Sequence, residues 1–83
     1  MTLVIGVDPH KQTHTAVAMT SGSGGLVGEL CAAAQAGGYA KLLTWALALD
    51  SERRVWALED VRGVSRGLER FLLEHERVVR VQS

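Results

Sequence analysis

The run LVIGVD at residues 3–8 constrains the fold more than any other segment of this chain. Both alternating sets of its side chains are apolar, and the run ends at Asp8, which Pro9 follows. A strand with one face in water alternates apolar and polar residues, whereas a strand covered on both faces is apolar throughout. The pattern therefore predicts a central strand of an α/β fold with a carboxylate at its carboxyl end.

The next segments predict two further strands that continue the first into an antiparallel meander. Thr13–Thr20 is rich in threonine, valine and alanine, which favours a strand. Glycines at positions 22, 24 and 25 indicate a turn, and Leu26–Cys31 follows it as the third strand.

From Tyr39 onward the pattern changes to helices that alternate with strands. Apolar residues recur every three and four residues over 39–49 and 64–75, which is the spacing of one helical face. A short apolar strand follows each helix, at Arg54–Leu58 and at Val78–Val81. The predicted order of elements is therefore βββαβαβ.

This order predicts how the sheet is assembled. Connections between parallel strands are right-handed in about 98% of cases, which gives a five-stranded mixed sheet in the order 3-2-1-4-5 with both helices on one face. The first and fourth strands then lie side by side and parallel. Asp8 and Glu59, which end these strands, are expected at the same carboxyl edge, where α/β sheets bind their ligands.

Length and composition exclude several classes of protein. The 83 residues suffice for a single small domain, and nine basic residues balance nine acidic ones. The chain therefore has no net charge that would attract it to nucleic acid or to an anionic membrane, so either partner must be bound by a local group of residues. Cys31 is the single cysteine and excludes an internal disulfide, which suits a cytoplasmic location. The polar residues 8–11 break the first apolar run, so neither a signal peptide nor a membrane span is expected.

Two carboxylates at one sheet edge predict a site for a divalent cation. Such a pair repels unless a cation neutralises it, and hard oxygen ligands suit Mg²⁺ or Mn²⁺. Metal ions held in this way can stabilise the attacking and leaving oxygens of a phosphodiester. In the alternative interpretation, Asp8 begins a turn and Glu59 is a solvated strand end. His10 and His14 lack further nitrogen or sulfur ligands nearby, so a zinc site is not expected.

Residues 5–11, IGVDPHK, with Thr13 and His14 after them, resemble the opening of the DEDD insertion-sequence transposases of the Piv-like type. Gly38–Tyr39 and the segment VWALE at 55–59 are similar to later parts of the same family, in the same order. The resemblance implies an RNase H-like (RuvC-like) fold and an activity in DNA transposition, in which DNA strands are cleaved and joined.

In that family four acids, in the order Asp, Glu, Asp, Asp, hold the metal ions, and the resemblance assigns Asp8 and Glu59 to the first two. The last two follow the fifth strand, so we expect residues 1–83 to be an N-terminal portion, truncated before the final helix and inactive alone. Mg²⁺ or Mn²⁺ is expected only with the missing carboxylates. The implied partners are DNA and, in the full protein, a guide RNA. Asp60 departs from the family's small residues and is either a loop acid or an additional carboxylate near the metal.

Several basic residues are candidates for contacts with nucleic acid. Lys11 follows Asp8 closely and is either a phosphate contact or an exposed turn lysine. Arg62, Arg66 and Arg70 recur every four residues. They form either a ridge along a nucleic-acid backbone or an ordinary solvated helix face.

Two other classes of function fit parts of the sequence. Sugar and acetate kinases of the actin-like superfamily also begin with an apolar strand, an aspartate and a threonine-rich strand. Their phosphate loop needs glycines and hydroxyls, which residues 9–12 lack. A non-catalytic interaction module from a decayed transposon is the third interpretation.

The central strands also predict an association surface. Both are apolar on their two alternating faces, whereas the two predicted helices cover one face only. The face that carries Val4, Gly6, Val55 and Ala57 is expected to be bare. We therefore expect a homo-oligomer that covers this face and buries at least about 1,000 Å².

Overall fold

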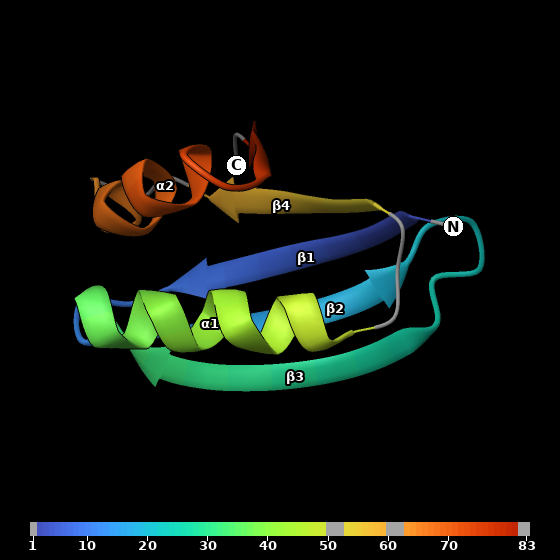
Figure 1. Ribbon diagram of the computed structural model, residues 1–83, viewed down its shortest axis with the longest axis horizontal. Coiled ribbons are helices and arrows are strands. Elements are labelled where there is room, and N and C mark those ends of the chain that lie inside the picture. Colours follow the sequence, from blue (N-terminus) through green and yellow to red (C-terminus); the bar gives the residue numbers. More distant parts are fainter. Residues whose placement is uncertain (1, 50–52, 60–62, 82–83) are drawn as a thin grey trace.

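The computed structural model describes residues 2–49, 53–59 and 63–81 (Figure 1). Its elements are β1 (Thr2–Pro9), β2 (Thr13–Thr20), β3 (Leu26–Ala33), α1 (Ala36–Ala48), β4 (Arg53–Glu59), α2 (Arg66–Leu73) and β5 (Arg77–Val81). The predicted order βββαβαβ is confirmed.

The five strands form one mixed sheet in the order β3-β2-β1-β4-β5. β2 is antiparallel to both β1 and β3, whereas β4 is parallel to both β1 and β5. The predicted strand order is confirmed. β1 lies at the centre because the meander extends the sheet on one side of it and the two crossovers extend it on the other.

The core lies between the sheet and the two helices. Along β1 and β2, buried side chains alternate with more exposed ones, so each strand turns one set of side chains toward the helices. The core consists of Ile5, Val7, Ala16, Ala18, Ala32, Trp56 and Leu58 from the strands and Leu42, Ala46, Leu68 and Leu72 from the helices. Both helices therefore pack on one face, as predicted, and Figure 1 shows α1 crossing in front of β2.

The opposite face, here called the open face, is not covered by any described element. Its central part is formed by Val4, Gly6, Asp8, Thr15, Val17, Met19, Val55, Ala57, Glu59, Val79 and Val81, as the strand registers show. A Cβ added at Gly6 would meet no atom within 4 Å, and Val79 and Val81 are each 48% exposed. Among the described residues, neither helix has the length and apolarity that a membrane crossing requires.

The helices differ from the predicted ranges at their ends. α1 begins at Ala36 rather than Tyr39, because the Tyr39 N–H already donates to the carbonyl of the extended N-cap residue Gln35 at 2.9 Å. α2 ends at Leu73 and begins only at Arg66, so Val64 and His75 lie in turns. Gly63 has a φ of 72°, and the buried Ser65 hydroxyl donates to the Glu59 carbonyl at 3.1 Å. These two features hold the chain in a turn where apolar spacing alone predicted helix.

Gly38 and Tyr39 place α1 against its neighbours. Gly38 is buried where α1 passes the end of β3, and a Cβ at this position would lie 1.7 Å from the Ala33 carbonyl oxygen. The Tyr39 ring stacks on that of His14, with centroids 6.0 Å apart, and contacts Phe71 of α2 at 6.1 Å. The first turn of α1 therefore joins β2, β3 and α2.

Candidate functional site

The parallel register of β1 and β4 brings the two predicted carboxylates together. Val7 lies opposite Leu58, and Asp8 and Glu59 are the next residues of their strands. Both carboxylates line one hollow of about 540 Å³ on the open face. The remaining lining residues are Gly6, Val7, Thr15, Val17, Met19, Ala57 and Val81. The predicted adjacency is confirmed, whereas the assignment of these carboxylates as metal ligands stays a prediction.

The floor of this hollow is apolar and its carboxylates lie at one end of it. Gly6 and Ala57 lie opposite each other on β1 and β4, and each precedes the carboxylate of its own strand by two residues, on the same face of the sheet. Their small side chains leave room above the sheet, because a Cβ at Gly6 would still meet nothing. The arrangement leaves Asp8 exposed and Glu59 half-buried. A hydrated cation or a flat substrate group could therefore approach the two carboxylates from the open side.

His10 is a contact of Asp8 that the sequence analysis missed. Its Nε2 atom lies 3.2 Å from Oδ2 of Asp8, and the two side chains are 61% and 70% exposed. His10 follows the last residue of β1, where the chain turns toward β2, so its closeness to Asp8 in the sequence was the only available signal. His14, by contrast, lies buried on the face of the sheet that the helices cover. The histidine beside Asp8 can orient that carboxylate by hydrogen bonding.

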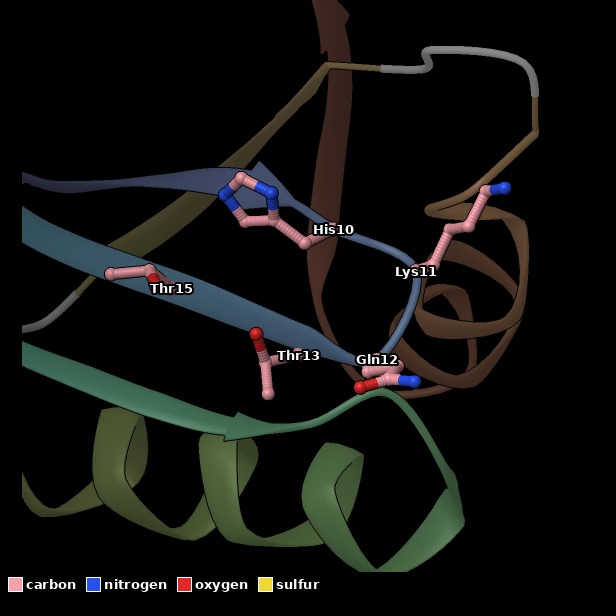
Figure 2. Close-up of a pocket in the computed structure, with 5 residues that line it drawn as sticks. All are labelled: His10, Lys11, Gln12, Thr13 and Thr15. Carbon is pink, nitrogen blue, oxygen red and sulfur yellow. The ribbon is translucent and has the colours of Figure 1, made fainter.

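The turn between β1 and β2 forms a second hollow beside the carboxylates. It measures about 640 Å³ and is lined by His10, Lys11, Gln12, Thr13 and Thr15. Figure 2 shows the Lys11 side chain pointing away from the hydroxyls of Thr13 and Thr15. Lys11 is exposed at the tip of this turn, and a contact with phosphate stays a prediction.

The predicted arginine ridge is not gathered around the carboxylates. Arg66 and Arg70 are exposed on α2, which packs on the helix side of the sheet, and the Arg66 guanidinium lies against Gly63. Arg62, like Asp60, lies outside the described residues. The described part of the ridge is therefore exposed on a helix that packs on the helix side of the sheet, and its role in binding nucleic acid stays a prediction.

The described residues contain no cluster of three or more His, Cys, Asp or Glu side chains that could hold a metal ion. Asp8 and Glu59 alone fit a cation of the Mg²⁺ type as part of a ligand set, because both offer hard oxygens on one face. Such cations take six or more oxygens. Water or further carboxylates must therefore supply the rest.

Comparison of the chain with protein families, curated proteins and solved structures finds no match. The function must therefore be argued from the geometry of the carboxylate pair.

Proposed function

We propose that this chain carries the first two metal-binding carboxylates of a metal-dependent DNA transposase or recombinase with an RNase H-like (RuvC-like) domain, working in the cytoplasm. The observation that supports it is the position of Asp8 and Glu59 at the carboxyl ends of two adjacent parallel strands, on one face. The same two acids are those that the resemblance to DEDD transposases selects. If Asp8 only began a turn and Glu59 were only a solvated strand end, the two carboxylates would not need to line the same hollow.

Each side chain of the site has a role in this proposal. Asp8 and Glu59 would hold Mg²⁺ or Mn²⁺, which when bound supplies charge neutralisation for phosphodiester cleavage and joining. His10 positions the Asp8 carboxylate through its Nε2 atom. Gly6 and Ala57 keep the floor of the hollow low, so that a nucleic-acid backbone can approach the carboxylates. DNA is the proposed substrate, with a guide RNA as a further partner of the full protein.

Titration of the 83-residue chain with Mn²⁺, followed by paramagnetic broadening of its amide signals, tests the metal site. Weak, saturable binding is expected, with broadening centred on Asp8 and Glu59, since two carboxylates supply few of the required ligands. Asp8→Asn and Glu59→Gln should each abolish saturation. Glu29→Gln is the matched control, because Glu29 is an exposed carboxylate opposite Val17 on β3 of the same sheet.

Broadening that is unchanged in Asp8→Asn, or that is lost equally in Glu29→Gln, would refute the metal site.

A cleavage assay on branched DNA tests whether the chain is active by itself. We expect the DNA to stay uncut even with Mn²⁺. Where the open reading frame continues past Ser83, it should encode two further aspartates on one helix. A glycine-rich phosphate loop in that continuation would instead identify a kinase of the actin-like superfamily.

A further inference from the structure

The open face carries its apolar centre and its two carboxylates on the same side of the sheet. Gly6 lies opposite Ala57 in the centre of this face, and Asp8 and Glu59 follow two residues further along the same strands. A Cβ at Gly6 would meet no atom within 4 Å, and Val79, which lies opposite Ala57 on β5, is 48% exposed. A partner that covers the apolar centre must therefore also approach the carboxylates.

A single chain offers an incomplete set of cation ligands. Asp8 and Glu59 are the two carboxylates that line the hollow, and the described residues hold no group of three or more His, Cys, Asp or Glu side chains that could bind a metal ion. His10 contacts one oxygen of Asp8, which leaves the other oxygen and the Glu59 carboxylate for a cation. Because Mg²⁺ and Mn²⁺ take six or more oxygens, a partner that brings carboxylates to the open face would enlarge the set.

A second copy of the chain satisfies both requirements if a two-fold axis runs along the strands between β1 and β4. Sheets that pack face to face keep their strands nearly aligned, and this axis places β1 of each copy over β4 of the other. Asp8 then faces the Glu59 of the second copy, and Gly6 faces its Ala57. The small residues allow the two sheets to approach closely, and four carboxylates meet at one end of the interface.

Without a cation, the four carboxylates oppose this arrangement. They repel one another and lose part of their hydration as the apolar surfaces around them come together. A divalent cation between the copies removes the repulsion and gains oxygen ligands that one chain lacks. Cation binding and association should therefore strengthen each other, by the same factor in both directions.

We propose that a divalent cation joins two copies of this chain through their open faces, with Asp8 and Glu59 of both copies as its ligands. These acids are the cation ligands of the proposed function, on which the proposal rests. It goes beyond the self-association expected from the sequence, because it fixes the orientation of the two copies and makes their association depend on the cation. An axis across the strands would instead place the carboxylates over the opposite ends of the second copy's strands, where no cation could bridge the two pairs.

Sedimentation velocity of the chain with and without Mn²⁺, at constant pH and ionic strength, tests the proposal. Mn²⁺ should lower the dissociation constant of the dimer about tenfold or more, within the usual range of coupling between two binding events. Asp8→Asn should abolish this effect and should strengthen association without Mn²⁺, because it removes a repelling charge from each copy. Glu59→Gln repeats the test at the second acid. Glu29→Gln is the matched control and should keep the Mn²⁺ effect, since Glu29 is exposed opposite Val17 and does not line the hollow.

Paramagnetic broadening of the amide signals by Mn²⁺ separates this proposal from the metal site on which it rests. Broadening centred on Asp8 and Glu59 with no change in sedimentation would overturn the cation-joined dimer and leave the metal site standing. Absence of broadening at both acids would overturn both. Association that Mn²⁺ weakens, or that Mn²⁺ strengthens equally in Asp8→Asn and in the unaltered chain, would also overturn the proposal.

Discussion

Arg54 at the start of β4 and Glu76 before β5 form a two-pronged ion pair across 22 residues of sequence. Arg54 Nε donates to Oε1 of Glu76 at 2.7 Å, and Nη2 donates to Oε2 at 3.3 Å. Burial alone would raise the pKa of Glu76, but hydrogen bonds from Arg54 and Trp56 hold it below its ordinary value. The pair therefore fastens β5 to β4.

Glu76→Gln should lower the free energy of unfolding by about 2–4 kcal/mol, since it leaves the partly buried Arg54 without its charge partner. Urea denaturation at neutral pH measures this loss. Glu74→Gln, at an exposed position two residues earlier, should change little. In the unaltered chain the same stabilisation is present above the ordinary glutamate pKa of 4.5 and should be lost as the pH falls through the depressed folded value. Equal stability of the two variants would contradict the structural role of the pair.

Gly37 and Gly38 should respond to alanine in opposite directions. Gly38→Ala places a Cβ against the Ala33 carbonyl, and the shift that this forces should cost about 1–3 kcal/mol or more. Gly37→Ala meets nothing within 4 Å and should stabilise the chain by about 0.4–1 kcal/mol, because alanine restricts the unfolded state. Thermal denaturation of both variants and of the unaltered chain measures these two changes in stability. A Gly38→Ala variant as stable as Gly37→Ala would rule out the close approach of α1 to β3.

His14 should make the stability of the chain depend on pH near neutrality. It is fully buried, neither ring nitrogen has a hydrogen-bond partner among the described residues, and burial, with a smaller effect of His10, lowers its pKa. The unfolded chain therefore binds this proton more readily. Stability should be complete above the ordinary pKa of 6.5 and decline as the pH falls toward the folded value, by at most about 1.4 kcal/mol per pH unit.

Urea denaturation between neutral and mildly acidic pH measures this decline. His14→Phe should flatten it, because phenylalanine can keep the stacking on Tyr39 without titrating. His75→Phe is the control at an exposed histidine. If the pH dependence of stability survives in His14→Phe and disappears in His75→Phe, His75 rather than His14 causes it, and the prediction is wrong.

Self-association through the open face remains a prediction. Light scattering at micromolar concentrations should show an oligomer, because a bare apolar sheet face favours association. Val79→Glu on this face should give a monomer, whereas Leu47→Glu, which replaces a residue of α1 that is 55% exposed, should not. A monomeric unaltered chain would contradict the expectation.

The sequence by itself determined the elements and their order in the sheet. Apolar runs, strand-favouring residue types and helical spacing are local properties, so Leu3–Asp8 and Thr13–Thr20 could be assigned as strands without any knowledge of their neighbours. Right-handed crossovers then left one natural strand order, which placed Asp8 beside Glu59. The adjacency of the two carboxylates was predictable because it follows from connectivity alone.

Only the tertiary structure decided which side chains meet between elements. Arg54 meets Glu76 only because of the register between β4 and β5, and the spacing of apolar residues in the sequence does not determine that register. The buried position of His14 and the tight approach of Gly38 to Ala33 likewise depend on how closely α1 packs against the sheet. Such contacts follow from three-dimensional packing, in which residues far apart in the chain compete for the same volume.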